Sequence, residues 1–229
     1  MTMAPDNNRL LTPKDIILVH GLYQTSFVMK VLGNRLASRG YRVHYFKYAT
    51  LKKTLSTNVE AFLSFLESFN QPYAIIGHSL GCLLTLKALQ KKSQTHLKAF
   101  IAITPPFKGA RIVQYLAKHD SDFLVGKSAA DLLPQNLDLR WDQSIPLGVI
   151  AGTDHSGPTA LLLERLTNTI PKNSLAGDGT VYLDETKIPG LTDFTALNKT
   201  HTMILFDKRL PILCDTFLQT GRFPKVDSQ

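Results

Sequence analysis

The sequence is poor in cysteine and has no long apolar run. Its 229 residues include only two cysteines, Cys82 and Cys214. A chain of this length does not need disulfides to fold, so we expect two buried thiols in a cytoplasmic protein. No window approaches the ~18 uninterrupted apolar residues of a membrane-spanning helix. The first residues, MTMAPDNNRLLTPKD, lack a basic segment followed by an apolar one, so we expect no secretory signal there.

Several functional motifs are also missing. We find no internal repeat, no Cys/His cluster with zinc spacing and no G-x-G-x-x-G turn, so neither a metal nor an organic cofactor is expected. The net charge of +8 raises the question of anionic partners. The lysines occur as short pairs, such as Lys52-Lys53 and Lys91-Lys92, without a nucleic-acid-reading motif. We therefore expect no nucleic acid partner; weak contact with an anionic membrane surface is the alternative to a merely solvated basic surface.

What the sequence does have is an alternation of short apolar runs and helical patterns. The predicted helices cover 25–39, a segment capped by Ser56 or Thr57, 80–92 and 207–219. The predicted strands are 15–21, 41–48, 73–78, 97–104, 145–152 and a weaker one at 193–199. This alternation predicts an α/β fold, in which a mostly parallel sheet is covered by helices on both faces.

Two regions interrupt the alternation within what we interpret as a single domain spanning residues 1–229. Residues 105–144 are rich in proline and carry one or two short helices, as a small cap would. Residues 154–192 form a second insertion, rich in glycine and proline. Both insertions leave from the carboxyl ends of predicted strands. Because the working groups of parallel sheets gather at those ends, both insertions should overhang a site.

The motif Gly77-His78-Ser79-Leu80-Gly81 lies at the junction between a predicted strand and a predicted helix. It matches G-x-S-x-G, in which a strained turn exposes a serine hydroxyl. Glycines two residues before and after the serine remove side chains that would collide with the neighbouring strand and helix. The helix N-terminus would favour negative charge developing next to the serine. The pattern therefore predicts that Ser79 is a nucleophile.

The chain resembles α/β-hydrolases, and more narrowly small bacterial lipase or esterase-like members. The segments that carry the resemblance follow in the family's order: ILVHGL (17–22), GHSLG (77–81), TPPFKGAR (104–111), DGTV (178–181) and HT (201–202). It covers roughly residues 15–220. The resemblance implies a minimal six-stranded core without the two opening antiparallel strands of larger members, and an oxyanion hole formed by the backbone amides of Leu22 and Leu80, with Tyr23 as a less favoured donor.

In this fold the chain order is serine, acid, histidine, so the base should lie late in the chain. His201 is the one histidine that follows the last predicted strand. Two acids compete. Asp154 directly follows a strand, whereas Asp178 opens the turn GDGTV. The resemblance favours Asp178, because the family's acid commonly opens such a turn, and Asp154 remains the alternative.

These residues predict a serine hydrolase that cleaves carboxylic esters, including lipid esters, through an acyl-enzyme. Tyr23, Phe27 and Phe107 are the predicted substrate contacts, with Tyr115, Leu116 and Leu161 to Leu163 as further apolar residues near the site. A thioesterase, acyltransferase or amidase with the same triad is one alternative. A hydrolase-fold binding protein without turnover is another. The sequence predicts neither the oligomeric state nor the acyl-chain length.

Overall fold

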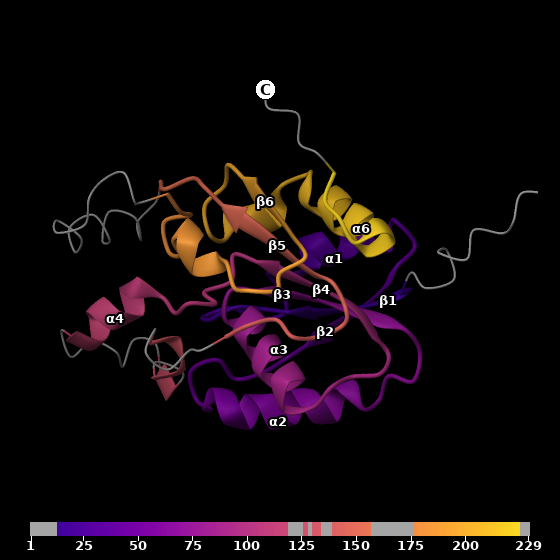
Figure 1. Ribbon diagram of the computed structural model, residues 1–229, viewed down its shortest axis with the longest axis horizontal. Coiled ribbons are helices and arrows are strands. Elements are labelled where there is room, and N and C mark those ends of the chain that lie inside the picture. Colours follow the sequence, from indigo (N-terminus) through magenta and orange to yellow (C-terminus); the bar gives the residue numbers. More distant parts are fainter. Residues whose placement is uncertain (1–12, 119–125, 128–129, 134–138, 157–175, 225–229) are drawn as a thin grey trace, which may run out of the picture.

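A single parallel sheet of six strands organises the computed structural model (Figure 1), which describes residues 13–118, 126–127, 130–133, 139–156 and 176–224. The strand order is β2-β1-β3-β4-β5-β6, and all five pairings are parallel. The predicted α/β class and the six-stranded core are thus confirmed. The strands are β1 (Asp15–Val19), β2 (Arg42–Phe46), β3 (Tyr73–His78), β4 (Leu97–Ile103), β5 (Leu147–Gly152) and β6 (Asp193–Leu197).

Helices cover both faces of this sheet, as the alternation predicts. Figure 1 shows α1 (Lys30–Ala37) and α6 (Leu210–Thr220) on one face, and α2 (Leu55–Leu66) and α3 (Leu80–Lys91) on the other. Helix α4 (Arg111–Lys118) belongs to the first insertion. Three short 3-10 helices complete the described elements: η3 (Ala130–Leu132), η6 (Leu183–Thr186) and η7 (Met203–Phe206). None of the described helices is long and apolar enough to cross a membrane.

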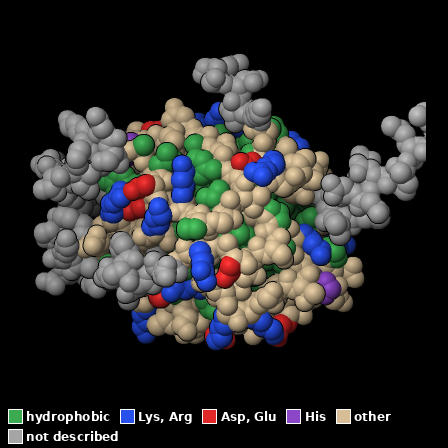
Figure 2. Space-filling model, viewed as in Figure 1, with side chains coloured by type: hydrophobic (Ala, Val, Ile, Leu, Met, Phe, Trp, Pro, Cys, Tyr) green, Lys and Arg blue, Asp and Glu red, His purple; other side chains and the backbone are tan. Residues whose placement is uncertain are grey.

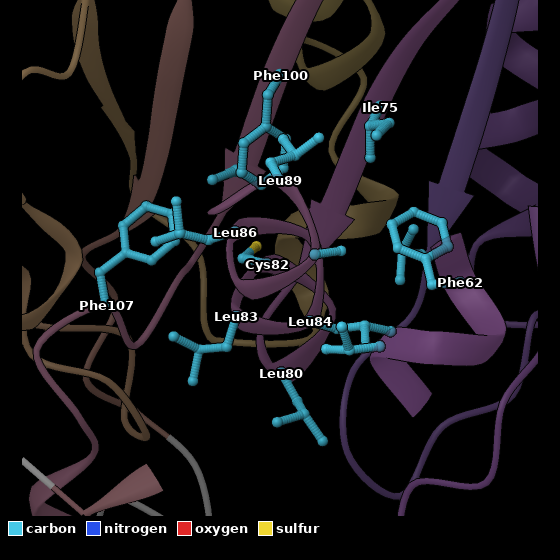
Figure 3. Close-up of a cluster of buried hydrophobic side chains, with 14 of the residues drawn as sticks. Phe62, Ile75, Leu80, Cys82, Leu83, Leu84, Leu86, Leu89, Phe100 and Phe107 are labelled. Atoms are coloured by element: carbon cyan, nitrogen blue, oxygen red, sulfur yellow. The ribbon is translucent and has the colours of Figure 1, made fainter. Parts of the chain in front are cut away.

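The sheet separates two apolar cores. Alternate residues of a strand point to opposite faces, so Ile17 packs toward α2 and α3 whereas Ile16 packs toward α1 and α6. Figure 3 shows part of the first core, where leucines of α3 meet Phe62 and Phe100. All five residues of β1 are buried, which is typical of a strand covered on both sides. Both cysteines are buried free thiols.

Element ends differ from the predicted ones by a few residues. The helix expected from residue 25 begins only at Lys30, because residues 22–29 are mostly in turns that carry the chain away from β1. The strand expected to reach residue 199 ends at Leu197. Parts of both predicted insertions lie outside the described residues, so their extents, and the single-domain interpretation, stay predictions.

Helix α2, in contrast, begins earlier than expected. The sequence predicts Ser56 or Thr57 as its cap, but Thr54 holds that position. The Thr54 backbone is extended, and its Oγ1 accepts a hydrogen bond from the Thr57 amide at 3.2 Å. We expect Thr54→Ala to lower the free energy of unfolding by about 1 kcal/mol, the usual cost of losing a cap. Ser56→Ala, inside the first turn, should cost less than half of that. Urea unfolding of both variants tests the assignment, and a larger cost for Ser56→Ala would contradict it.

Candidate active site

Ser79 stands on a strained turn between β3 and α3. Its φ of 52° and ψ of −122° lie in a region that residues with a side chain rarely adopt. The flanking glycines explain how the turn fits. A Cβ on Gly77 would lie 3.1 Å from the backbone of Cys82 in α3, and one on Gly81 would lie 2.5 Å from the Val19 carbonyl oxygen of β1. Both glycines of the motif are therefore required, because the neighbouring backbone leaves no room for a side chain, as the sequence predicts.

Three predicted residues meet at this turn. The Nε2 atom of His201 lies 2.9 Å from the Oγ of Ser79, and its Nδ1 lies 2.7 Å from the Oδ2 of Asp178. His201 belongs to the loop between β6 and η7. The carboxylate of Asp178 is fully buried, while 14% of the His201 side chain is exposed. An imidazole held in this way can accept the Ser79 proton while the carboxylate stabilises the resulting positive charge.

Asp178 is itself fixed by its own turn. Its Oδ1 accepts hydrogen bonds from the amides of Thr180 at 2.9 Å and Val181 at 2.8 Å. Gly179, with a φ of 84°, permits this tight geometry. The backbone carbonyl of Asp178 also accepts a hydrogen bond from the His201 amide at 2.9 Å. The turn thus presents only Oδ2 to the imidazole.

The alternative acid, Asp154, points elsewhere. Its Oδ1 accepts a hydrogen bond from the Ser156 amide at 2.9 Å, and hydrogen bonds from Ser156 lower the pKa of its carboxyl. A Cβ on Gly152, the last residue of β5, would lie only 2.6 Å from the Cβ of Asp178. Asp178 therefore lies against the carboxyl end of β5, and Asp178 rather than Asp154 contacts His201.

A buried histidine lies between the loop that carries His201 and the loop after β1. The Nε2 of His78 donates to the His201 carbonyl at 2.9 Å, and its Nδ1 lies 3.0 Å from the Oε1 of Gln24. The Gln24 oxygen accepts a hydrogen bond from the Gly21 amide at 3.0 Å. Burial lowers the pKa of His78 to about 3, so its ring is neutral. Our sequence reasoning assigned His78 only to its motif and missed this bridge.

The two predicted oxyanion donors lie next to Ser79. Leu80 opens α3, where backbone amides have no partner within the helix. Leu22 follows Gly21, whose Cβ would lie 2.9 Å from the Cβ of Ser79. Among the described residues, neither amide donates a hydrogen bond. Their role in an oxyanion hole stays a prediction.

Residues with a strained backbone lie at the carboxyl ends of the strands. Within the described part of the chain, the non-glycine residues with positive φ are Tyr23, Ser79 and Thr104, and they follow β1, β3 and β4. Thr104 is β-branched and fully buried, and its hydroxyl has no hydrogen-bond partner among the described residues. Strained residues persist where the surrounding structure holds them, and they cluster at functional sites.

The predicted substrate contacts have different surroundings. Tyr23 and Phe27 are 62% and 71% exposed, on the loop that holds Gln24. Phe107 is fully buried and packs against the core near α3 (Figure 3). The side chains of Tyr115 and Leu116, and residues 161–163, lie outside the described ones. Contact of Tyr23, Phe27 and Phe107 with a substrate stays a prediction.

A buried carboxylate, which sequence reasoning missed, lies just after the Asp178 turn. Glu185 of η6 accepts hydrogen bonds from the amides of Arg111 at 2.9 Å and Tyr182 at 2.8 Å. Burial raises the pKa of Glu185 to about 7. Arg111, the first residue of α4, also pairs with Asp184 at 3.2 Å. Helix α4 is therefore tied to the segment that carries Asp178.

A second group of titratable residues lies at the opposite end of the sheet. Asp15 accepts hydrogen bonds from Arg42 Nε at 2.9 Å and approaches His44 Nε2 at 2.8 Å, and the Arg42 guanidinium lowers the pKa of Asp15. A cavity of about 440 Å³ adjoins them, walled by Phe65 and Phe69. This cluster joins the amino ends of β1 and β2, far along the strands from Ser79. We interpret it as an ion pair that holds two strands together.

Comparisons with known proteins find a matching family model and several structures of similar fold. The family model for lecithin:cholesterol acyltransferase matches residues 38–122. The mature Bacillus licheniformis lipase BlEst2 superposes with a TM-score of 0.73 over 94% of this chain and 95% of that one, at 16% identity. The Paleococcus ferrophilus monoacylglycerol lipase gives a TM-score of 0.61 over 91% and 96%, at 15% identity.

Mouse alpha/beta hydrolase domain-containing protein 10 superposes with a TM-score of 0.60 over 90% of both chains, at 16% identity. This chain spans about half of two longer structures, 54% of the propeptide form of BlEst2 and 53% of the Legionella pneumophila phospholipase PlaB. No curated protein shows significant sequence similarity to it. At sequence identities this low, the structural similarity establishes a shared fold and nothing more specific.

Proposed function

This chain has the α/β-hydrolase fold, and we propose that it is a serine hydrolase acting on carboxylic esters, with lipid esters as the substrate class. The observation that carries the proposal is the chain of hydrogen bonds from Ser79 through His201 to Asp178. It is located at the carboxyl ends of parallel strands, on a serine with a strained backbone. Such an arrangement is costly to hold and has no evident structural benefit.

In the proposed reaction, His201 Nε2 takes the proton of Ser79 as its Oγ attacks the ester carbonyl carbon. The amides of Leu22 and Leu80 hold the oxyanion, each contributing about 3–4 kcal/mol to transition-state stabilisation. His201 then gives the proton to the departing alkoxide, which leaves as the alcohol. A water molecule, deprotonated by His201, attacks the acyl-enzyme and releases the acid. Throughout, Asp178 holds the Nδ1–H tautomer.

Several observations support a lipid ester. Structures of similar fold include a lipase, a monoacylglycerol lipase and a phospholipase. The exposed rings of Tyr23 and Phe27 lie on the loop beside Ser79, where they can contact an acyl chain. We also propose that the protein is located in the cytoplasm, where free thiols such as these two buried cysteines stay reduced.

Acyl transfer is the second candidate, since the matching family model is that of an acyltransferase and its matched residues include Ser79. The same acyl-enzyme would then pass to an alcohol instead of water. A binding protein without turnover is less well supported, because such a protein has no need for a serine, a histidine and a carboxylate in hydrogen-bond contact.

A series of p-nitrophenyl esters from acetate to palmitate tests the proposal, with Ser79→Ala as control. We expect turnover by the native chain and loss of at least ~10³-fold in kcat for the variant. Adding a competing alcohol and measuring the new ester separates transfer from hydrolysis. Equal rates for the native chain and Ser79→Ala would exclude both enzymatic readings.

A further inference from the structure

Exposed apolar side chains are concentrated at the catalytic end of the molecule. Among the described residues, the large apolar side chains that are exposed include Tyr23, Phe27, Leu51 and Met203, on the segments that follow β1, β2 and β6. The remaining one, Ile212, lies in the first turn of α6, which starts near the same end. A single exposed apolar residue is ordinary, but a set that shares one end of the sheet indicates a contact surface.

The same end also carries lysines without acidic partners. Lys47, Lys52, Lys53 and Lys127 are exposed, and no ion pair joins any of them to the described residues. By contrast, Lys91 pairs with Glu60 and Lys92 pairs with Glu67. These two lysines lie at the C-terminal end of α3, toward the amino ends of the strands. Residues 41–59 contain no aspartate or glutamate. No acidic residue of this segment therefore balances the charge of Lys47, Lys52 and Lys53.

Four of these residues form one continuous edge. The Lys127 amide donates to the Leu51 carbonyl at 3.1 Å, and a Cβ on Gly126 would lie 2.8 Å from the same oxygen. This contact brings part of the first insertion against the loop after β2. We call Leu51, Lys52, Lys53 and Lys127 the lysine edge.

We propose that the lysine edge binds an anionic lipid surface and turns the Ser79 end of the molecule toward it. Lysine ammonium groups attract anionic headgroups, and exposed apolar side chains beside them can enter the headgroup layer. A nucleic acid would need a continuous basic groove, whereas Figure 2 shows cations in small separate groups among uncharged, apolar and acidic surface on the face it presents. The inference rests on the proposed function only for the substrate, which would be a lipid presented in that surface.

Sedimentation with lipid vesicles tests this proposal. We expect the full chain to bind vesicles of phosphatidylcholine mixed with phosphatidylglycerol, and to bind vesicles of phosphatidylcholine alone far more weakly. Lys52→Glu combined with Lys53→Glu should lower the partition coefficient for the anionic vesicles by about 30-fold or more, since each lysine near such a surface adds measurable attraction. Added salt should weaken the binding of the native chain.

A matched pair of lysines controls for net charge. Lys14 and Lys98 lie at the amino ends of β1 and β4, also without an ion-pair partner among the described residues, so Lys14→Glu with Lys98→Glu makes the same charge change at the other end. We expect this control to retain most of the binding. Equal losses in both double variants, retention by Lys52→Glu/Lys53→Glu, or equal binding to neutral vesicles would each overturn the proposal.

Hydrolysis of a short ester in solution keeps this test separate from the proposed function. Lys52→Glu/Lys53→Glu should leave that rate within about 2-fold of the native one, because neither lysine contacts the Ser79 site. A native chain that binds anionic vesicles but cleaves no ester would refute the hydrolase proposal and leave the docking surface standing. An active chain without vesicle binding would refute the docking surface alone.

Discussion

Replacing Asp178 with asparagine should lower kcat by about 10⁴-fold, whereas Asp154→Asn should change it by less than ~3-fold. The asparagine would offer an amide where His201 Nδ1 now meets a carboxylate at 2.7 Å, which favours the wrong tautomer and removes the charge that stabilises imidazolium. Asp154 instead accepts a hydrogen bond from Ser156. Steady-state kinetics on a short ester measures both effects.

The two substitutions are matched in chemistry, and both acids lie on loops after β5. Thermal unfolding of each variant shows whether it is folded at the assay temperature. Comparable losses in both would mean that the two carboxylates act together. A loss confined to Asp154→Asn would transfer the role of the acid to Asp154 and contradict the assignment of Asp178.

Glu185→Gln should change how stability depends on pH. Burial raises the pKa of Glu185 in the native state to about 7, from 4.5 for the free side chain. Between these values the native state holds a proton that the unfolded chain has released, so stability falls as pH rises and stays lowered above pH 7. The shift corresponds to about 3 kcal/mol. Glutamine does not titrate, so it removes this contribution to the slope.

Urea unfolding between pH 4 and pH 8 measures the difference. Any constant cost of Glu185→Gln, such as a weaker hydrogen bond to the Arg111 amide, cancels when only the slope is compared. We expect the free energy of unfolding of the variant, relative to the native chain, to rise by roughly 3 kcal/mol across this range. Glu67→Gln, which removes an exposed carboxylate, is the control. Parallel profiles for the native chain and Glu185→Gln would show that this carboxyl ionises normally in the fold.

The elements predicted best are those set by local pattern. The strand 73–78 is found with the expected bounds, because a short β-rich run between turn residues has few alternatives. Its junction with α3 places Ser79 on the turn that the motif requires. The predicted start of α1 was wrong by several residues, since apolar Phe27 fits a helical pattern but lies in an exposed turn.

The supporting contacts of the site were beyond sequence reasoning. His78 contacts His201, 123 positions away in the sequence, and Glu185 contacts Arg111, 74 positions away. No periodicity or spacing in the sequence predicts such pairs, because they form only when the strand order brings their loops together at one end of the sheet. The choice between Asp154 and Asp178 was of the same kind. The residues alone left it open, whereas the structure places Asp178 against Gly152 and in contact with the imidazole.

If Ser79 is an activated nucleophile, as we propose, it should react covalently with an electrophilic phosphorus probe. The purified chain would be treated with a fluorophosphonate probe in the presence of detergent, and the modified peptide located by mass spectrometry, with Ser79→Ala as control. We expect labelling at Ser79 alone, abolished in the variant and strongly reduced in His201→Ala. A folded native chain that stays unlabelled, or one labelled equally well without His201, would contradict the proposal.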